Sequence, residues 1–66
     1  MKIVFNGQER EIDPEATVAD LLDASGLGGK RIAIEVNLEI VPRGDFATRR
    51  LASDDRVEIV HAIGGG

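Results

Sequence analysis

The segment Lys2–Asp13, KIVFNGQEREID, predicts a β-hairpin at the start of the chain. Its first part, Lys2–Phe5, is rich in β-branched and aromatic residues, which favour strands. The dipeptide Asn6-Gly7 follows and accepts the positive φ angles of a type I′ turn. The return strand, predicted over Glu9–Asp13, carries acidic residues at alternate positions. We therefore expect this strand to have one solvent-exposed face and to lie at or near the edge of a sheet, where charges discourage pairing with other chains.

A short helix is predicted after Pro14, which ends the hairpin. Thr17 is the expected N-cap, and Asp20 makes a partial match to a capping box, in which Glu or Gln is preferred. Gly26 is expected to end the helix in the left-handed conformation. Three apolar residues with i, i+3, i+4 spacing would face the core from this helix: Val18, Leu21 and Leu22.

Three further strands complete the predicted fold. They are expected over Ile32–Val36, near Glu39–Val41 and over Val57–Ile63, with a helical turn at Asp45–Arg50 that anchors Phe46. The order β-β-α-β-β-β predicts an α+β fold, in which a small mixed sheet packs on one main helix and a helical turn precedes the last strand. We expect one domain over residues 1–63 and a flexible glycine tail over residues 64–66.

Composition narrows the function classes. The 66 residues have a formal net charge of −4, eight glycines, one histidine and no cysteine. A chain of this length buries only about 60% of its unfolded surface, which argues against a self-contained enzyme. The acidic net charge argues against binding of nucleic acid. The lone histidine, His61, argues against a metal-binding cluster and against a role as general base. Without a signal segment or a membrane-length apolar run, the expected compartment is the cytoplasm.

The last strand leads into Gly64-Gly65-Gly66, which has no evident role in folding. A frayed terminus is one interpretation. The other is that the tail enters a narrow active site, reaching about 10 Å beyond the fold and presenting its carboxylate there. A carboxylate becomes reactive as a mixed anhydride with AMP, from which a sulfur or nitrogen nucleophile displaces the nucleotide. The chain would then be a substrate or carrier rather than a catalyst.

The whole chain resembles the ubiquitin-like β-grasp family, and within it most closely the ThiS family of sulfur carriers in bacterial thiamine biosynthesis. The segments that carry this resemblance are Ile3–Gly7, Thr17-Val18 with Leu21-Leu22, Val36–Arg43, and Val57–Val60 before the glycine end. Terminal Gly-Gly alone marks only the superfamily. The Asn-x-Glu-Ile-Val-Pro-Arg segment at Asn37–Arg43, combined with a tight Asn-Gly hairpin, is more specific.

The resemblance implies that Gly66 is adenylated and converted to a thiocarboxylate, with Gly64 and Gly65 as the threading segment. It also implies three partners: a ThiF-type adenylating enzyme, a ThiG-type thiazole synthase, and a sulfur donor such as a cysteine desulfurase. ATP would be used by the adenylating enzyme, and this chain would bind no cofactor. Related alternatives are a carrier for molybdopterin synthesis, a ubiquitin-like modifier, or a β-grasp binding module with an inert tail.

A docking surface is expected on the open face of the sheet. Val4, Val60 and Ala62 are predicted to share that face and to form an apolar patch for a partner. Scattered exposed aliphatic residues, which are common on any protein surface, are the alternative interpretation.

Overall fold

The computed structural model describes residues 1–61, and it contains five strands, one α-helix and one 3₁₀ turn in that range. The elements are β1 (Lys2–Phe5), β2 (Gln8–Glu11), α1 (Val18–Ala24), β3 (Ile32–Val36), β4 (Glu39–Val41), η1 (Arg43–Asp45) and β5 (Arg56–His61). This order confirms the predicted α+β arrangement of the β-grasp type.

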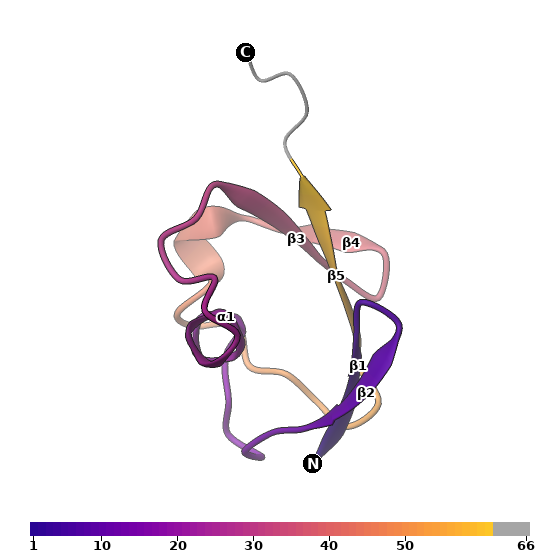
Figure 1. The fold of residues 1–66 in the computed structure, drawn as a ribbon. Coiled ribbons are helices and arrows are strands. Elements are labelled where there is room, and N and C mark those ends of the chain that lie inside the picture. Colours follow the sequence, from indigo (N-terminus) through magenta and orange to yellow (C-terminus); the bar gives the residue numbers. More distant parts are fainter. Residues whose placement is uncertain (62–66) are drawn as a thin grey trace.

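The strands form one mixed sheet in the order β2-β1-β5-β3-β4. The central strand β5 runs parallel to β1 and antiparallel to β3, while β2 and β4 lie at the two edges. The acidic strand β2 is therefore an edge strand, as predicted. Figure 1 shows α1 on one side of the sheet, with β5 directed toward the C-terminal end.

The first hairpin has the predicted two-residue turn. Asn6 has φ 51° and Gly7 has φ 81°, so both central residues take the positive φ of a type I′ turn. The return strand spans Gln8–Glu11 rather than the predicted Glu9–Asp13. The two-residue turn places Gln8 directly opposite Phe5, so the return strand begins at Gln8. It ends at Glu11 because Glu11 lies opposite Lys2, the first residue of β1.

The helix begins and ends as the sequence predicts. The Thr17 backbone N–H donates to Asp20 Oδ2 at 3.0 Å, and the Asp20 N–H donates to Thr17 Oγ1 at 3.2 Å, so aspartate completes the capping box. At the other end Gly26 has φ 75°, and Leu27 N–H donates to the carbonyl of Leu22 at 2.8 Å. This bond closes a Schellman motif, which satisfies a carbonyl at the helix end.

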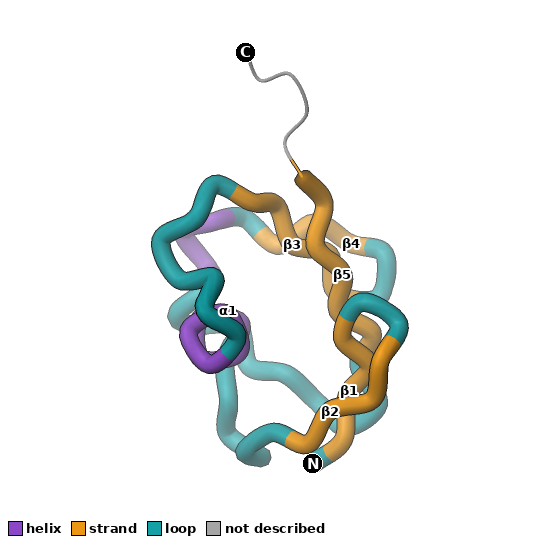
Figure 2. The backbone as a smooth tube through the Cα atoms, viewed as in Figure 1, coloured by secondary structure: helices purple, strands orange, loops and turns teal. Residues whose placement is uncertain are grey.

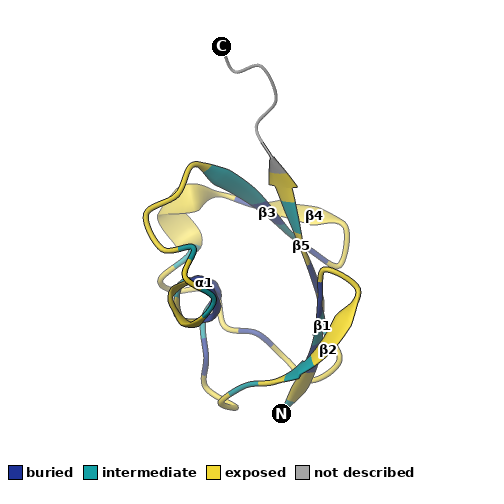
Figure 3. Ribbon diagram, viewed as in Figure 1, coloured by how far each residue is buried: buried dark blue, intermediate teal, exposed yellow. Residues whose placement is uncertain are grey.

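The core lies between the helix and one face of the sheet. Figure 2 shows the strands gathered on one side of the molecule and α1 on the other, and Figure 3 shows their buried segments facing each other. The largest fully buried side chains are Ile3, Val18, Leu21, Ile34, Val36 and Val57. The predicted helix positions Val18, Leu21 and Leu22 are all buried.

The helical turn before the last strand begins earlier than predicted. It is a 3₁₀ turn over Arg43–Asp45 instead of Asp45–Arg50. Pro42, with φ −57°, starts the turn at once, and Asp45 N–H donates to the Pro42 carbonyl at 2.8 Å. Phe46 follows the turn and packs partly buried against the core, as expected.

Candidate functional site: the central strand and the open sheet face

Strand β5 is held in place chiefly by β3. The two strands pair over five residues each, Ile32–Val36 with Val57–His61. On its other side β5 pairs with β1 only at Arg56 and Val57. Of the predicted last strand, residues 57–61 are confirmed, and β5 also includes Arg56. Positions 62 and 63 lie outside the described residues, as do Gly64, Gly65 and Gly66 of the predicted tail.

Two asparagines fix β5 through their side chains. Asn6 Oδ1 accepts a hydrogen bond from the Ile59 N–H at 2.9 Å, in line with the β1 ladder. Asn37 Oδ1 accepts from the Arg56 N–H at 2.9 Å, and Asn37 Nδ2 donates to Asp55 Oδ1 at 3.0 Å. The sequence marked both asparagines only as turn residues. Their positive φ angles, 51° and 52°, aim each side chain from a hairpin turn back onto the central strand.

Of the predicted docking residues, Val4 and Val60 lie on one face of the sheet but not in one patch. Val4 is half-buried and lies opposite Arg56, whereas Val60 is 38% exposed and lies opposite Ala33. Arg56 and Val60 are four positions apart along β5, which corresponds to about 13 Å. Charged residues occupy the space between them, and Ala62 lies outside the described residues.

Other apolar residues are more exposed than the predicted ones. Leu38 is 79% and Ile40 58% exposed. Leu38 occupies the second position of the β3–β4 turn with φ 71°, a conformation that leucine rarely adopts. Both residues fall inside the Asn37–Arg43 segment, but only the strand register shows that Ile40, opposite Glu35, belongs to the open face.

The open face carries a pair of like charges. Glu35 and Glu58 lie directly opposite each other on β3 and β5. Like charges in this position repel, and such a pair destabilises a sheet by a few tenths of a kcal/mol to about 1 kcal/mol. No Lys or Arg within residues 1–61 forms an ion pair with either carboxylate. A basic side chain from a partner would relieve this repulsion between the two carboxylates.

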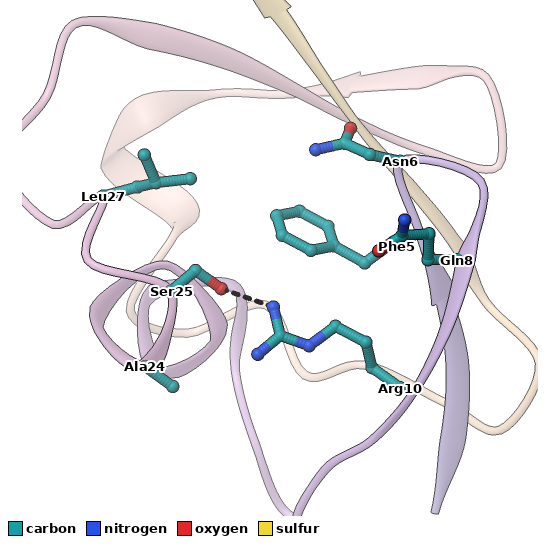
Figure 4. Close-up of a pocket in the computed structure, with 7 residues that line it drawn as sticks. All are labelled: Phe5, Asn6, Gln8, Arg10, Ala24, Ser25 and Leu27. Carbon is teal, nitrogen blue, oxygen red and sulfur yellow. Dashed lines mark hydrogen bonds between the residues drawn. The ribbon is translucent and has the colours of Figure 1, made fainter.

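A hollow of 610 Å³ lies on the opposite face, between the first hairpin and the C-terminal end of α1. Figure 4 shows Arg10 reaching from β2 toward Ser25, with Phe5 beside it. Arg10 Nη1 donates to Ser25 Oγ at 2.9 Å, and the guanidinium carbon lies 5.5 Å from the centre of the Phe5 ring. The residues that line the hollow are Phe5, Asn6, Gln8, Arg10, Ala24, Ser25 and Leu27.

This hollow can bind a small chemical group, but its lining has no His, Cys, Asp, Glu or Lys for acid–base catalysis or for activation of the Ser25 hydroxyl. Arg10 is its one charged residue, and arginine stays protonated in proteins. Within residues 1–61, no group of three or more His, Cys, Asp or Glu side chains could hold a metal ion. A search of the same residues for a helix long and apolar enough to cross a membrane finds none.

Fold and site together define a small domain of the ubiquitin-like class, with a β-grasp sheet whose central strand leads to a glycine-rich end. The model of the ThiS family matches residues 3–66, and the chain therefore belongs to the ThiS family. This is a family of small sulfur carrier proteins in thiamine biosynthesis. The resemblance inferred from the sequence is confirmed.

Known relatives agree with this assignment. The sulfur carrier protein ThiS of Escherichia coli is 30% identical over 66 residues, covering 100% of both chains. The crystal structure of the thiamine biosynthesis protein ThiS from Geobacter metallireducens matches with a TM-score of 0.86 and 28% identity, again over 100% of both chains. The thiazole synthase of Paramagnetospirillum magneticum is 44% identical over all 66 residues, but the chain spans only 20% of that protein's length.

Proposed function

We propose that this chain carries sulfur as a thiocarboxylate on Gly66 for formation of the thiazole ring. A ThiF-type enzyme would join the Gly66 carboxylate to AMP, using ATP and releasing pyrophosphate. Hydrosulfide, released by a thiol reductant from the persulfide of a donor such as a cysteine desulfurase, would then displace AMP from the acyl carbon. A ThiG-type thiazole synthase would take the sulfur from the resulting thiocarboxylate.

The observation that carries the proposal is the ThiS family match, which covers residues 3–66 and so includes Gly66. The absence of cysteine supports it, because no side chain of this protein can hold sulfur as a persulfide. The division into a domain, residues 1–63, and a tail, residues 64–66, stays a prediction. In this proposal Gly64 and Gly65 thread the tail into the partner's active site.

The partner assignment is supported by two thiazole synthases. Those of Paramagnetospirillum magneticum and Magnetococcus marinus each contain a segment similar to this whole chain, at 44% and 38% identity, which makes up 20% of their length. Combination of a carrier-like segment and a synthase in one polypeptide is consistent with direct transfer between the two. The chemistry also needs ATP, which fits the proposed cytoplasmic location.

Intact mass spectrometry tests the proposal. The protein is incubated with ATP, its adenylating enzyme and a sulfur donor, and its mass is compared with that of untreated protein. We expect a mass increase equal to replacement of one oxygen by sulfur, localised to the C-terminal peptide. The matched control is the chain without Gly65 and Gly66, which should not change.

Two results would contradict the carrier function. If the mass does not change under conditions where a control carrier reacts, the result would support the interpretation that the tail is inert. An isopeptide adduct on another protein, without a thiocarboxylate, would favour a ubiquitin-like modifier.

A further inference from the structure

Strand β5 has one side that is only partly covered by the rest of the sheet. β1 pairs with β5 at Arg56 and Val57, and then turns away at Asn6-Gly7. The Asn6 side chain supplies one more acceptor, for the Ile59 N–H. Backbone groups of a strand point alternately to its two sides, so the His61 N–H points to the same side as that of Ile59, past the end of β1.

The opposite side of β5 is occupied over the same residues. β3 pairs with β5 through Val60 and His61, opposite Ala33 and Ile32. The last residues of β5 therefore form part of the sheet on one side and offer a short open edge on the other. Among residues 1–61, no strand pairs with this side of β5 beyond Val57, and the Ile59 carbonyl and the His61 N–H point toward it. An extended peptide can add to an edge of this kind through backbone hydrogen bonds.

Hollows lie on both faces of the sheet beside the Asn6-Gly7 turn, where β1 leaves β5. On the helix side is the 610 Å³ hollow of Figure 4, whose rim includes Asn6 and Gln8. On the open face a second hollow of 320 Å³ is lined by Val4, Gly7, Arg56 and Glu58. Side chains of a strand alternate between the two faces. A strand lying along the end of β5 would therefore direct its side chains alternately toward one hollow and the other.

The charges at the two hollows differ in sign. Toward the helix side lies Arg10, which has no carboxylate within ion-pair distance among residues 1–61. Toward the open face lies Glu58, which faces Glu35 across the strands. The best-fitting segment thus has an acidic or amide side chain directed inward and a basic side chain directed outward.

We propose that an extended segment of thiazole synthase adds to the open edge of β5 and forms a strand beside Ile59–His61. This inference rests on the proposed function, which makes the synthase a partner, and on the thiazole synthases that contain a segment similar to this chain. The added strand fixes the direction of β5 as it leads toward residues 62–66. The synthase thereby aligns the tail before any chemistry takes place.

Amide hydrogen exchange measured by NMR tests the added strand. The labelled, unmodified chain is compared alone and with saturating purified thiazole synthase. We expect the His61 amide to exchange rapidly in the free chain and at least tenfold more slowly in the complex. The Val60 amide, which faces β3, is the internal control and should be protected in both states.

A pair of variants separates the backbone from the side chain. His61→Pro removes the N–H that the added strand would use, on the side of β5 that faces away from β3, and His61→Ala keeps that N–H. Calorimetry should give an affinity for thiazole synthase about tenfold weaker for His61→Pro and within about twofold of the original for His61→Ala.

The outcomes distinguish this inference from the proposed function. Binding to the synthase with unchanged exchange of the His61 amide would overturn the added strand and leave sulfur transfer intact. Protection that rises with the concentration of the chain alone would assign the edge to a second copy and would also overturn it. No binding to the synthase would contradict both, and the mass experiment then decides separately whether Gly66 carries sulfur.

Discussion

The two faces of β3 and β5 are built from the same stretches of chain and yet have opposite properties. The face toward α1 contains Ile34, Val36 and Val57, all fully buried. The other face contains the opposed pair Glu35 and Glu58, together with exposed apolar residues of which Val60 is one. The alternation of side chains along a strand produces this division directly.

The comparison teaches where stability and recognition reside. The buried face removes apolar surface from water and holds the sheet on the helix. The open face includes exposed apolar side chains and a repulsive charge pair, and that pair lowers the stability of the isolated protein. Features that cost stability without serving the fold point to contacts with a partner.

The largest effect is expected on the buried face. Ile34→Ala should destabilise the protein by about 2–5 kcal/mol, because Ile34 is fully buried and its removal leaves a cavity. Val60→Ala is the matched control on the open face of the neighbouring strand, and it should cost less than about 1 kcal/mol. Urea unfolding of both variants measures the difference. Equal losses would contradict the assignment of the two faces.

A smaller effect is expected where a turn holds the central strand. Asn6→Ala removes the acceptor for the Ile59 N–H and places alanine at φ 51°, so a loss of about 1–3 kcal/mol is expected. Gln8→Ala, an exposed position in the same hairpin, should stay within about 0.5 kcal/mol. Thermal unfolding compares the two. A loss no larger than that of Gln8→Ala would show that the asparagine is only a turn residue.

The smallest expected effect is a gain in stability rather than a loss. Glu58→Gln relieves the repulsion from Glu35, and stability should rise by a few tenths of a kcal/mol at low salt and less at high salt. Glu9→Gln is the control, because Glu9 pairs with Lys2 at 3.6 Å and its loss should be neutral or slightly destabilising. A loss of stability in Glu58→Gln would mean that Glu58 makes a favourable contact in the isolated protein.

Local patterns predicted most of the fold. Asn6-Gly7 indicated its turn type because few residue pairs accept two positive φ angles. Thr17 and Gly26 marked the helix ends, and the spacing of Val18, Leu21 and Leu22 marked its buried face. Each of these features depends on residues close together in the chain, and for that reason the sequence alone was sufficient.

Features that depend on strand register were not predictable in the same way. Val4 and Val60 were expected in one patch, but the register places Val4 opposite Arg56, which lies about 13 Å along β5 from Val60. The contact between Glu35 and Glu58 and the bond from Ile59 to Asn6 likewise join distant parts of the chain. The proposed role of Gly66 came from the resemblance to a family rather than from any local pattern.

The central claim is that the fold and the chemistry reside in separate parts of the chain. The most direct test is ATP–pyrophosphate exchange by the ThiF-type adenylating enzyme, measured with the original chain and with Gly66→Ala, alongside thermal unfolding of both. We expect exchange to fall at least tenfold in Gly66→Ala, while the unfolding free energy stays within about 0.5 kcal/mol. Undiminished exchange in a variant of equal stability would contradict the claim that Gly66 is the residue on which the adenylating enzyme acts.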